Sequence, residues 1–345
     1  MQPFEARNGF ALPAVLAVTG VVTLVFLVAI TALASLTAEA ASARARLRFI
    51  ERVLTLEAGI AFLATTEPIS SQGFMVGGSR ALNEFQTGPD TPQTTVSNST
   101  GLVRIDGRPY VTDVRGPLLV NLQDQAGMIN LAALDNSQTQ RLASLLDIPP
   151  SLARDLTALT TDYVDKDNLR QPSGAEQSDY GGVLANRPML RPAEWLSLRG
   201  VREAVSAAKW RAFRGDIATD ATLPSVNVNT ASIPTLQVLF DLSPQQAEAA
   251  VRDRESAPFP SINEFSAAVG AAFIGNSEQI YTFPSGRVIY TIRDSRSPWT
   301  YRARLTLTPS GLEQPLWIDQ TELTEAPRRA VADTSNATRF PYAPR

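Results

Sequence analysis

Residues 10–38, FALPAVLAVTGVVTLVFLVAITALASLTA, decide how this chain is organised, because no charged side chain interrupts them. Apolar side chains fall on every side of a helix built from this stretch, which indicates contact with lipid all round. A bilayer core about 30 Å thick is crossed by about 20 apolar residues. The stretch is long enough to span a membrane, and we expect a membrane helix here.

A cleaved secretory signal is the alternative, with Ala38-Glu39-Ala40 as a small-x-small cleavage site. Signal cores are typically about 7–15 residues long and follow a basic region. This run is longer, and the only basic residue before it is Arg7, so its length favours an anchor. Basic residues beside a membrane helix tend to lie on the cytoplasmic side. Four arginines follow this run, so charge alone indicates that the N-terminus lies outside the cytoplasm. They are Arg44, Arg46, Arg48 and Arg52.

The composition excludes several classes of function. The 345 residues carry a net charge of -3 and include neither Cys nor His. Disulfides, thiol nucleophiles, imidazole bases and the usual zinc ligands are therefore missing, and we expect no enzyme. A weakly acidic chain also has no basic field that would gather nucleic acid.

The start of the apolar run carries a specific motif. Gly9-Phe10-Ala11-Leu12-Pro13 resembles the leader of type IV prepilins, where a dedicated peptidase cuts after Gly and methylates the new N-terminal Phe. The resemblance implies that residues 1–9 are a leader, that Gly9 and Phe10 are the processing residues, and that residues 10–38 span the inner membrane once. The N-terminus would be cytoplasmic and the C-terminal domain periplasmic.

Ala14 narrows this resemblance to one family. Most pilins and pseudopilins carry Glu at the fifth mature position, where this chain has Ala14. The type II secretion system protein K family typically lacks that Glu, which is read as placing the subunit at the filament tip. The chain resembles this family over nearly its whole length, which implies a minor pseudopilin that primes the pseudopilus for export of folded proteins across the outer membrane. Implied partners are I-like and J-like minor pseudopilins, the major pseudopilin and prepilin peptidase, with no nucleic acid.

The pattern beyond the membrane run predicts a helix and then strands. Apolar residues at Leu47, Ile50, Leu54, Ala58 and Ala61 repeat at helical spacing and predict one packed side. Strands are expected at 102–105 and 110–114, joined by a hairpin at Asp106-Gly107, and at 118–122. Further strand patterns follow at 287–293, 300–307 and 315–319.

Helical patterns fill the sequence between these two groups of strands. Ser243 with Gln246 and Ser261 with Glu264 indicate helix starts. A weak repeat relates residues 129–131 and 146–149 to residues 226–228 and 240–243. We expect an α+β fold: a pilin-like long N-terminal helix packed on a small antiparallel sheet, with a large inserted α-helical domain containing helix-hairpin-helix/SAM-like repeats. The expected boundaries are 39–129 for the helix and first strands, 130–275 for the insertion, 276–325 for the returning strands and 326–345 for a disordered tail.

The second repeat raises an alternative function. Residues 226–230 also resemble part of helix-hairpin-helix DNA-binding modules, which would make the chain a membrane-anchored DNA-binding or uptake protein. Those modules hold phosphate through a Gly-containing hairpin, whereas this hairpin has Asp241 in an acidic chain. The electrostatics therefore favour the pseudopilin.

One acidic segment is a candidate metal site. Calcium takes about six to eight oxygen ligands, and carboxylates are dense at Asp162, Asp165, Asp167, Glu176 and Asp179. A solvated loop is the simpler interpretation from the residues alone, because the Gly and terminal Glu of an EF-hand are missing. Protein K carries a matching Asp-rich segment and calcium is associated with its α-domain, so the resemblance implies calcium as a possible cofactor.

A glycosidase with paired acids would need a cleft, which nothing in the sequence indicates.

Overall fold

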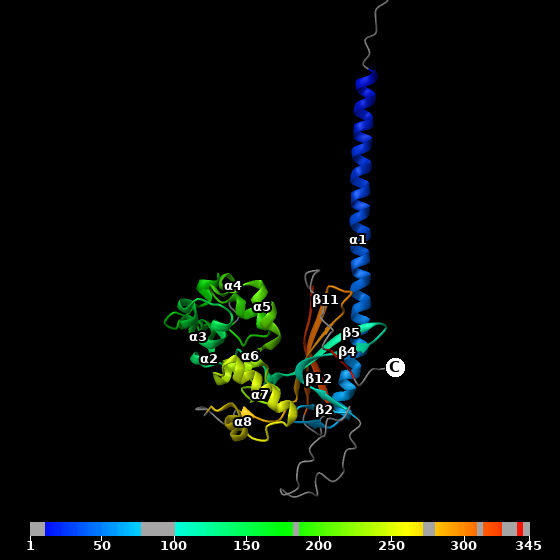
Figure 1. The fold of residues 1–345 in the computed structure, drawn as a ribbon. Coiled ribbons are helices and arrows are strands. Elements are labelled where there is room, and N and C mark those ends of the chain that lie inside the picture. Colours follow the sequence, from blue (N-terminus) through cyan, green and yellow to red (C-terminus); the bar gives the residue numbers. More distant parts are fainter. Residues whose placement is uncertain are drawn as a thin grey trace, which may run out of the picture. The chain divides into compact units, whose positions relative to one another are not determined.

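A single long helix begins the structure. The computed structural model describes residues 11–76, 101–181, 186–271, 280–308, 313–325 and 337–340, and helix α1 (Ala11–Thr66) opens it (Figure 1). Residues 1–52 and 53–345 form two compact units. By length and composition α1 can cross a membrane, which is compatible with a single-pass anchor. The hydroxyls of Thr19, Thr23 and Thr31 donate to carbonyls one turn earlier, so these polar groups are satisfied within the helix itself.

The second unit is built on a six-stranded sheet with the order β12-β11-β10-β5-β4-β13. Neighbours are antiparallel except β13 and β4, which are parallel. Strands β5 and β10 pair, with Val120 opposite Ile292, so the strands before and after the helical region share one sheet. The strands are β4 (Asp106–Asp113), β5 (Pro117–Asp124), β10 (Arg287–Arg293), β11 (Trp299–Leu307), β12 (Leu316–Glu325) and β13 (Thr338–Arg339).

The expected hairpin at Asp106-Gly107 is wrong. Strand β3 (Leu102–Arg104) pairs with β2 (Gly73–Met75) in a separate sheet that also holds β1 (Ile69–Ser70). Gly107 has a φ of 83°, and the pairing of β4 with β5 shifts beside it, so the turn signal marks an irregularity inside β4. The chain reverses instead at Arg115 and Gly116, where φ is 51° and 113°.

The packed face of α1 also differs from the expectation. Val53, Leu56 and Leu63 are each 0% exposed, whereas Leu54 is 52% exposed. Glu57 on the packed side reaches β10 and β11. The sequence has apolar residues on more than one side of this helix, so spacing alone could not tell which side the sheet covers.

The chain between β5 and β10 is mainly helical. In Figure 1 these helices lie on one side of the sheet and residues 53–66 of α1 on the other. They are α2 (Asn136–Leu145), α3 (Pro150–Val164), α4 (Val201–Ala204), α5 (Ala207–Phe213), α6 (Ile233–Phe240), α7 (Pro244–Ser256) and α8 (Ile262–Val269). Short 3-10 turns η1 (Gln125–Gly127), η2 (Gln177–Tyr180), η3 (Pro192–Ser197) and η4 (Arg214–Asp216) connect them. Two short parallel pairs of strands complete this region. Strand β6 (Ile129–Asn130) pairs with β7 (Ile217–Ala218), and β8 (Val226–Asn227) pairs with β9 (Ile280–Tyr281).

The two sequence repeats share local geometry. Asn130 Oδ1 accepts from the Ala132 N–H at 3.2 Å, and Asn227 Oδ1 accepts from the Asn229 N–H at 3.0 Å. Each copy then turns between two helices through an aspartate in the left-handed conformation, with φ 58° at Asp147 and 56° at Asp241. Aspartate tolerates this conformation better than most residues. Assignment of the repeats to the helix-hairpin-helix or SAM-like class stays a prediction.

Asp124 joins the sheet to the second repeat. It is 0% exposed at the end of β5. Its carboxylate accepts hydrogen bonds from Asn227 Nδ2 at 3.0 Å, Thr230 Oγ1 at 2.8 Å and Ser285 Oγ at 2.7 Å. Burial raises the pKa of Asp124 against the lowering effect of these donors. One buried carboxyl thereby holds three separate stretches of chain together.

The expected disorder of the tail is wrong for residues 338–340. Strand β13 pairs with β4, and Phe340 is 2% exposed with its ring 5.7 Å from that of Tyr110, edge to face. Burial of this aromatic ring offsets the entropy of ordering a short segment. Residues 326–336 and 341–345 lie outside the described residues, and the expected domain boundaries stay predictions.

Candidate metal centre

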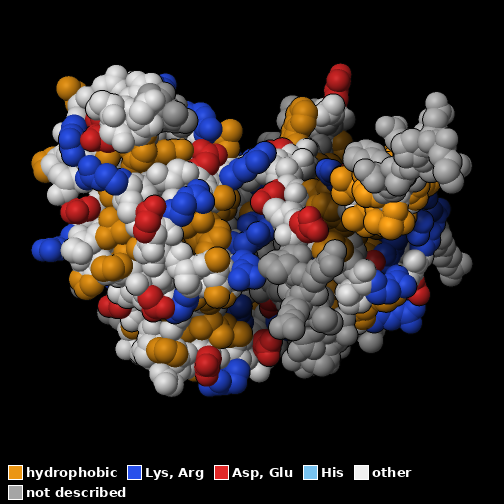
Figure 2. Space-filling model, turned by 90° about the horizontal axis from the view of Figure 1, so that it is seen from above, with side chains coloured by type: hydrophobic (Ala, Val, Ile, Leu, Met, Phe, Trp, Pro, Cys, Tyr) orange, Lys and Arg blue, Asp and Glu red, His pale blue; other side chains and the backbone are white. Residues whose placement is uncertain are grey.

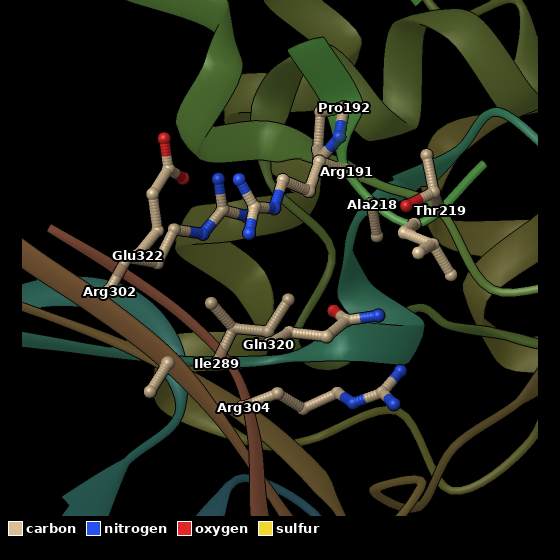
Figure 3. Close-up of a pocket in the computed structure, with 11 residues that line it drawn as sticks. Arg191, Pro192, Ala218, Thr219, Ile289, Arg302, Arg304, Gln320 and Glu322 are labelled. Atoms are coloured by element: carbon tan, nitrogen blue, oxygen red, sulfur yellow. The ribbon is translucent and has the colours of Figure 1, made fainter. Parts of the chain in front are cut away.

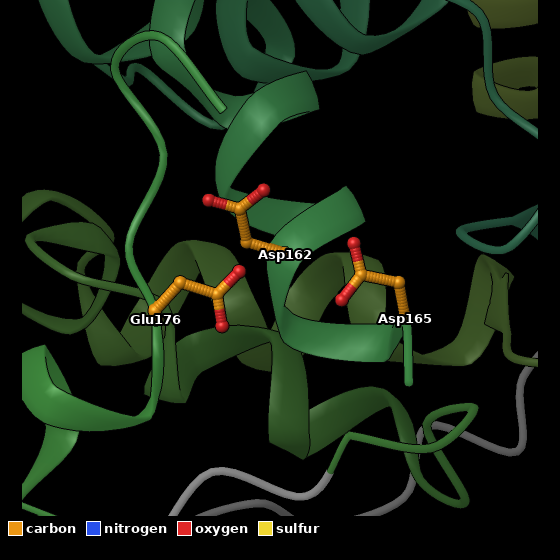
Figure 4. A group of neighbouring side chains, drawn as sticks. All are labelled: Asp162, Asp165 and Glu176. Atoms are coloured by element: carbon orange, nitrogen blue, oxygen red, sulfur yellow. The ribbon is translucent and has the colours of Figure 1, made fainter. Parts of the chain in front are cut away.

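Three carboxylates meet where α3 ends. Asp162 lies in the last turn of α3, Asp165 caps that helix, and Glu176 precedes η2. One ligand oxygen from each lies within 4.8 Å of the others (Figure 4). Asp162 and Asp165 share a helix face because they are three residues apart. The carbonyl end of a helix carries partial negative charge, so the position itself favours a cation.

The loop after α3 brings Glu176 back to this helix. The Gln171 N–H donates to both Asp162 oxygens, at 3.2 and 3.1 Å. Gly174 lies so close that a Cβ there would overlap Asp162 Oδ2, so only glycine permits this approach. The Gly174 carbonyl accepts from Arg170 Nε at 3.1 Å. These contacts fix the loop against Asp162 and place Glu176 beside it.

Several oxygens of this cluster are buried without a hydrogen-bond partner among the described residues: Asp165 Oδ1, Glu176 Oε1 and Glu176 Oε2. Glu176 is only 5% exposed. Burial, and then the charges of Asp162 and Asp165, raise the pKa of Glu176. Burial, and then the charges of Asp167 and Asp162, raise the pKa of Asp165. A bound cation would relieve both the desolvation and the repulsion.

The other two expected ligands make different contacts. Asp167 is exposed, and its Oδ1 accepts from the Leu169 N–H at 2.8 Å. Asp179 Oδ2 accepts from the Glu176 N–H at 2.9 Å, and its Oδ1 lies 3.7 Å from Arg170 and 3.9 Å from Arg199. Asp179 therefore positions the Glu176 backbone. Sequence reasoning missed the two arginines, although Arg170 stands between the acids in the sequence.

This arrangement suits an ion better than a large substrate. Asp162 is 0% exposed, so a sugar polymer could not reach it together with Glu176 as glycosidase chemistry requires.

The expected processing residues Gly9 and Phe10 lie outside the described residues.

The helical region matches a known family. Models of type II secretion system (T2SS) protein K match residues 119–209 and 226–280. Type II secretion system protein K of Pseudomonas aeruginosa is 31% identical over 175 residues. Over these residues the chain is similar to the type II secretion system protein K family. The aligned residues cover 46% of this chain and 50% of that relative, so the chain spans about half the length of the curated relative it matches. The acidic cluster falls inside the first matched segment.

A solved structure shares the fold. A chain in the crystal structure of the GspK-GspI-GspJ complex from the enterotoxigenic Escherichia coli type 2 secretion system has a TM-score of 0.52 at 14% identity. The alignment covers 82% of this chain and 99% of that chain. At this identity the likeness shows the fold alone. The family matches do not support the alternative of a DNA-uptake protein.

Proposed function

We propose that this protein is a minor pseudopilin at the tip of a type II secretion pseudopilus, where it primes filament assembly for export of folded proteins. The observation that carries the proposal is α1, a helix of 56 residues. Its first part is apolar on all sides, and residues from Val53 onward pack on the sheet. Ala14 supports the tip position, because an unpaired carboxylate inside a membrane would be costly.

The partners in this proposal are I-like and J-like minor pseudopilins, with the major pseudopilin below them. The fold neighbour comes from a complex named for such subunits. Leu54 supports contact through α1, because it stays 52% exposed while its neighbour Val53 is fully buried. An apolar side chain turned away from the core of its own domain is available to another helix. In the proposed orientation the N-terminus is cytoplasmic, where prepilin peptidase cuts between Gly9 and Phe10.

Leu54→Arg in the full-length chain tests the partner contact. Co-expression with the I-like and J-like subunits should show their co-purification lost, because a buried arginine without a partner is costly, while the melting temperature of the lone protein stays unchanged. Leu169→Arg is the matched control, since Leu169 is 77% exposed in the helical region. Full recovery of both partners with Leu54→Arg would exclude this face of α1 as the contact.

We also propose that Asp162, Asp165 and Glu176 bind calcium. The unpartnered buried oxygens of Glu176 and Asp165 support this proposal most directly. Calcium accepts carboxylates from a compact set of oxygens and completes its shell with backbone carbonyls and water. The ion would join the end of α3 to the loop that carries Glu176, so its role would be to stabilise the inserted region. Isothermal titration of the full chain with calcium tests this, with Glu176→Gln as the variant that should lose binding.

A further inference from the structure

A narrow cleft lies between the helical region and the sheet, and none of the residues that line it belongs to the acidic cluster (Figure 3). Arg191 and Thr219 come from the helical side, and Arg302, Arg304 and Glu322 come from β11 and β12. The cleft has room for about 20 Å³, which is enough for a group about the size of one water molecule. Figure 2 shows basic and acidic side chains side by side on the face seen from above.

Thr219 leaves a donor unused in this cleft. The residue is 5% exposed, and its Oγ1 is buried without a hydrogen-bond partner among the described residues. Figure 3 shows the hydroxyl turned toward the space between the two walls. Leaving a buried hydroxyl without a hydrogen-bond partner is unfavourable, so its position indicates a group that it contacts in the working protein.

Two guanidinium groups converge on the same space. Arg191 and Arg302 reach toward one another from opposite walls (Figure 3). Arg302 is 9% exposed and donates to the carbonyls of Arg214 at 2.9 Å and Ile217 at 3.1 Å. A guanidinium has five N–H donors, so further donors remain. Burial, with the nearby charge of Arg214, lowers the pKa of Arg302 to about 10, which leaves it protonated at neutral pH.

The charges around the cleft do not cancel. Arg304 is paired with Asp220 at 2.7 Å and with Asp319 at 2.8 Å. Arg191 and Arg302 then face a single acid, Glu322, which forms an ion pair with neither of them in the described part of the chain. The other charged groups that act on Arg302 are Arg214 and Asp216, of opposite sign. One positive charge is left over; Arg191 is exposed to solvent, whereas Arg302 is buried and has less water to balance its charge.

We propose that this cleft binds one small monovalent anion, chloride or a carboxylate as small as acetate, between Arg191, Arg302 and the Thr219 hydroxyl. The anion accepts hydrogen bonds from donors on both walls, and charge-assisted hydrogen bonds of this kind are the strong ones. Because Arg191 belongs to the helical region and Arg302 to the sheet, the bound anion holds the two against one another. The site is independent of the proposed calcium ion and of the partner subunits.

Chloride-35 NMR on the full chain in detergent tests the proposal directly. At constant ionic strength in sodium gluconate, whose anion is too large for the cleft, the protein should broaden the chloride signal, and Arg191→Gln should reduce the excess width severalfold. Arg154→Gln is the matched control, because Arg154 is exposed on α3, and it should behave as the wild type. Thr219→Val, which keeps the side-chain shape, should weaken chloride binding as well. Added acetate that reverses the broadening identifies a site that also takes carboxylates, and acetate without effect identifies a halide site.

A thermal measurement provides the second readout. Replacing gluconate by chloride should raise the melting temperature of the wild type in a saturable way, by mass action, and should leave that of Arg191→Gln unchanged. Equal line widths for the wild type and Arg191→Gln would overturn the proposal. A melting temperature that rises equally in both proteins would also overturn it, because a general salt effect does not need Arg191.

Discussion

The hydroxyl of Tyr301 donates a 2.7 Å hydrogen bond to the carboxylate of Glu57. The hydroxyl of Tyr290 donates to the same oxygen, so one acid on α1 is held by two neighbouring strands. Burial, and then Glu57, raise the pKa of both tyrosines, which keeps them protonated as donors. Within an otherwise apolar layer, this contact specifies how residues 53–66 of α1 lie on the sheet.

Tyr301→Phe should lower stability, because it removes a hydrogen bond to a charged group, worth about 1.5–3 kcal/mol. At about 2–4 °C per kcal/mol for a domain of this size, the melting temperature should fall by several degrees. Tyr281→Phe is the matched control, since Tyr281 is 50% exposed and its hydroxyl makes no hydrogen bond in the described part of the chain. Similar losses from both substitutions would show that the Glu57 contact contributes nothing specific.

Calcium should raise the melting temperature of the full chain, and a chelator should reverse the increase. At a free concentration one hundred times the dissociation constant, binding adds about 2.7 kcal/mol, which corresponds to about 5–10 °C. Glu176→Gln should abolish the response, while Asp167→Asn should retain most of it because Asp167 stands outside the cluster. A melting temperature that changes with neither calcium nor chelator would show that these acids form an acidic loop without a bound metal ion.

The calcium response should shrink as the pH falls. In the metal-free fold the pKa values of Asp165 and Glu176 are raised, so the folded state binds protons more readily than the unfolded chain. That contribution to stability is present at low pH and is lost as the pH rises through the raised pKa values. Protons and calcium therefore compete, and the gap between loaded and chelated melting temperatures should narrow from about pH 7.5 to about pH 5. A constant gap across this range would contradict proton competition.

Gly9→Val should block processing, because a side chain at that position would restrict the backbone and crowd the peptidase site. The uncut protein should stay in the inner membrane and secretion should stop. Gly20→Val is the control, since a Cβ at Gly20 meets nothing within 4 Å. Mass spectrometry of the wild-type protein should find an N-methylated Phe10 at the start. A mature chain that starts at Ala41, or an intact leader in a secreting cell, would refute the pseudopilin proposal.

Local sequence determined the features that depend on neighbouring residues alone. The uninterrupted run at 10–38 specifies a helix suited to lipid, and the alternation at 287–293 corresponds to β10 with the expected bounds. Ser243 and Gln246 form the expected capping box of α7. Helical propensity, strand alternation and caps act within a few residues, so they can be read without knowing the rest of the fold.

Tertiary structure decided everything that needs a distant partner. The sequence marks Gly107 as a turn, but pairing of β4 with β5 makes it an irregularity within a strand. Spacing showed that α1 is apolar, and only the sheet decided that Val53 is covered and Leu54 exposed. The five acids are equivalent in sequence, yet the loop at Gly174 selects Asp162, Asp165 and Glu176. Strand pairing, burial and the meeting of Arg191 with Arg302 depend on contacts between residues far apart in the chain, which short-range patterns do not encode.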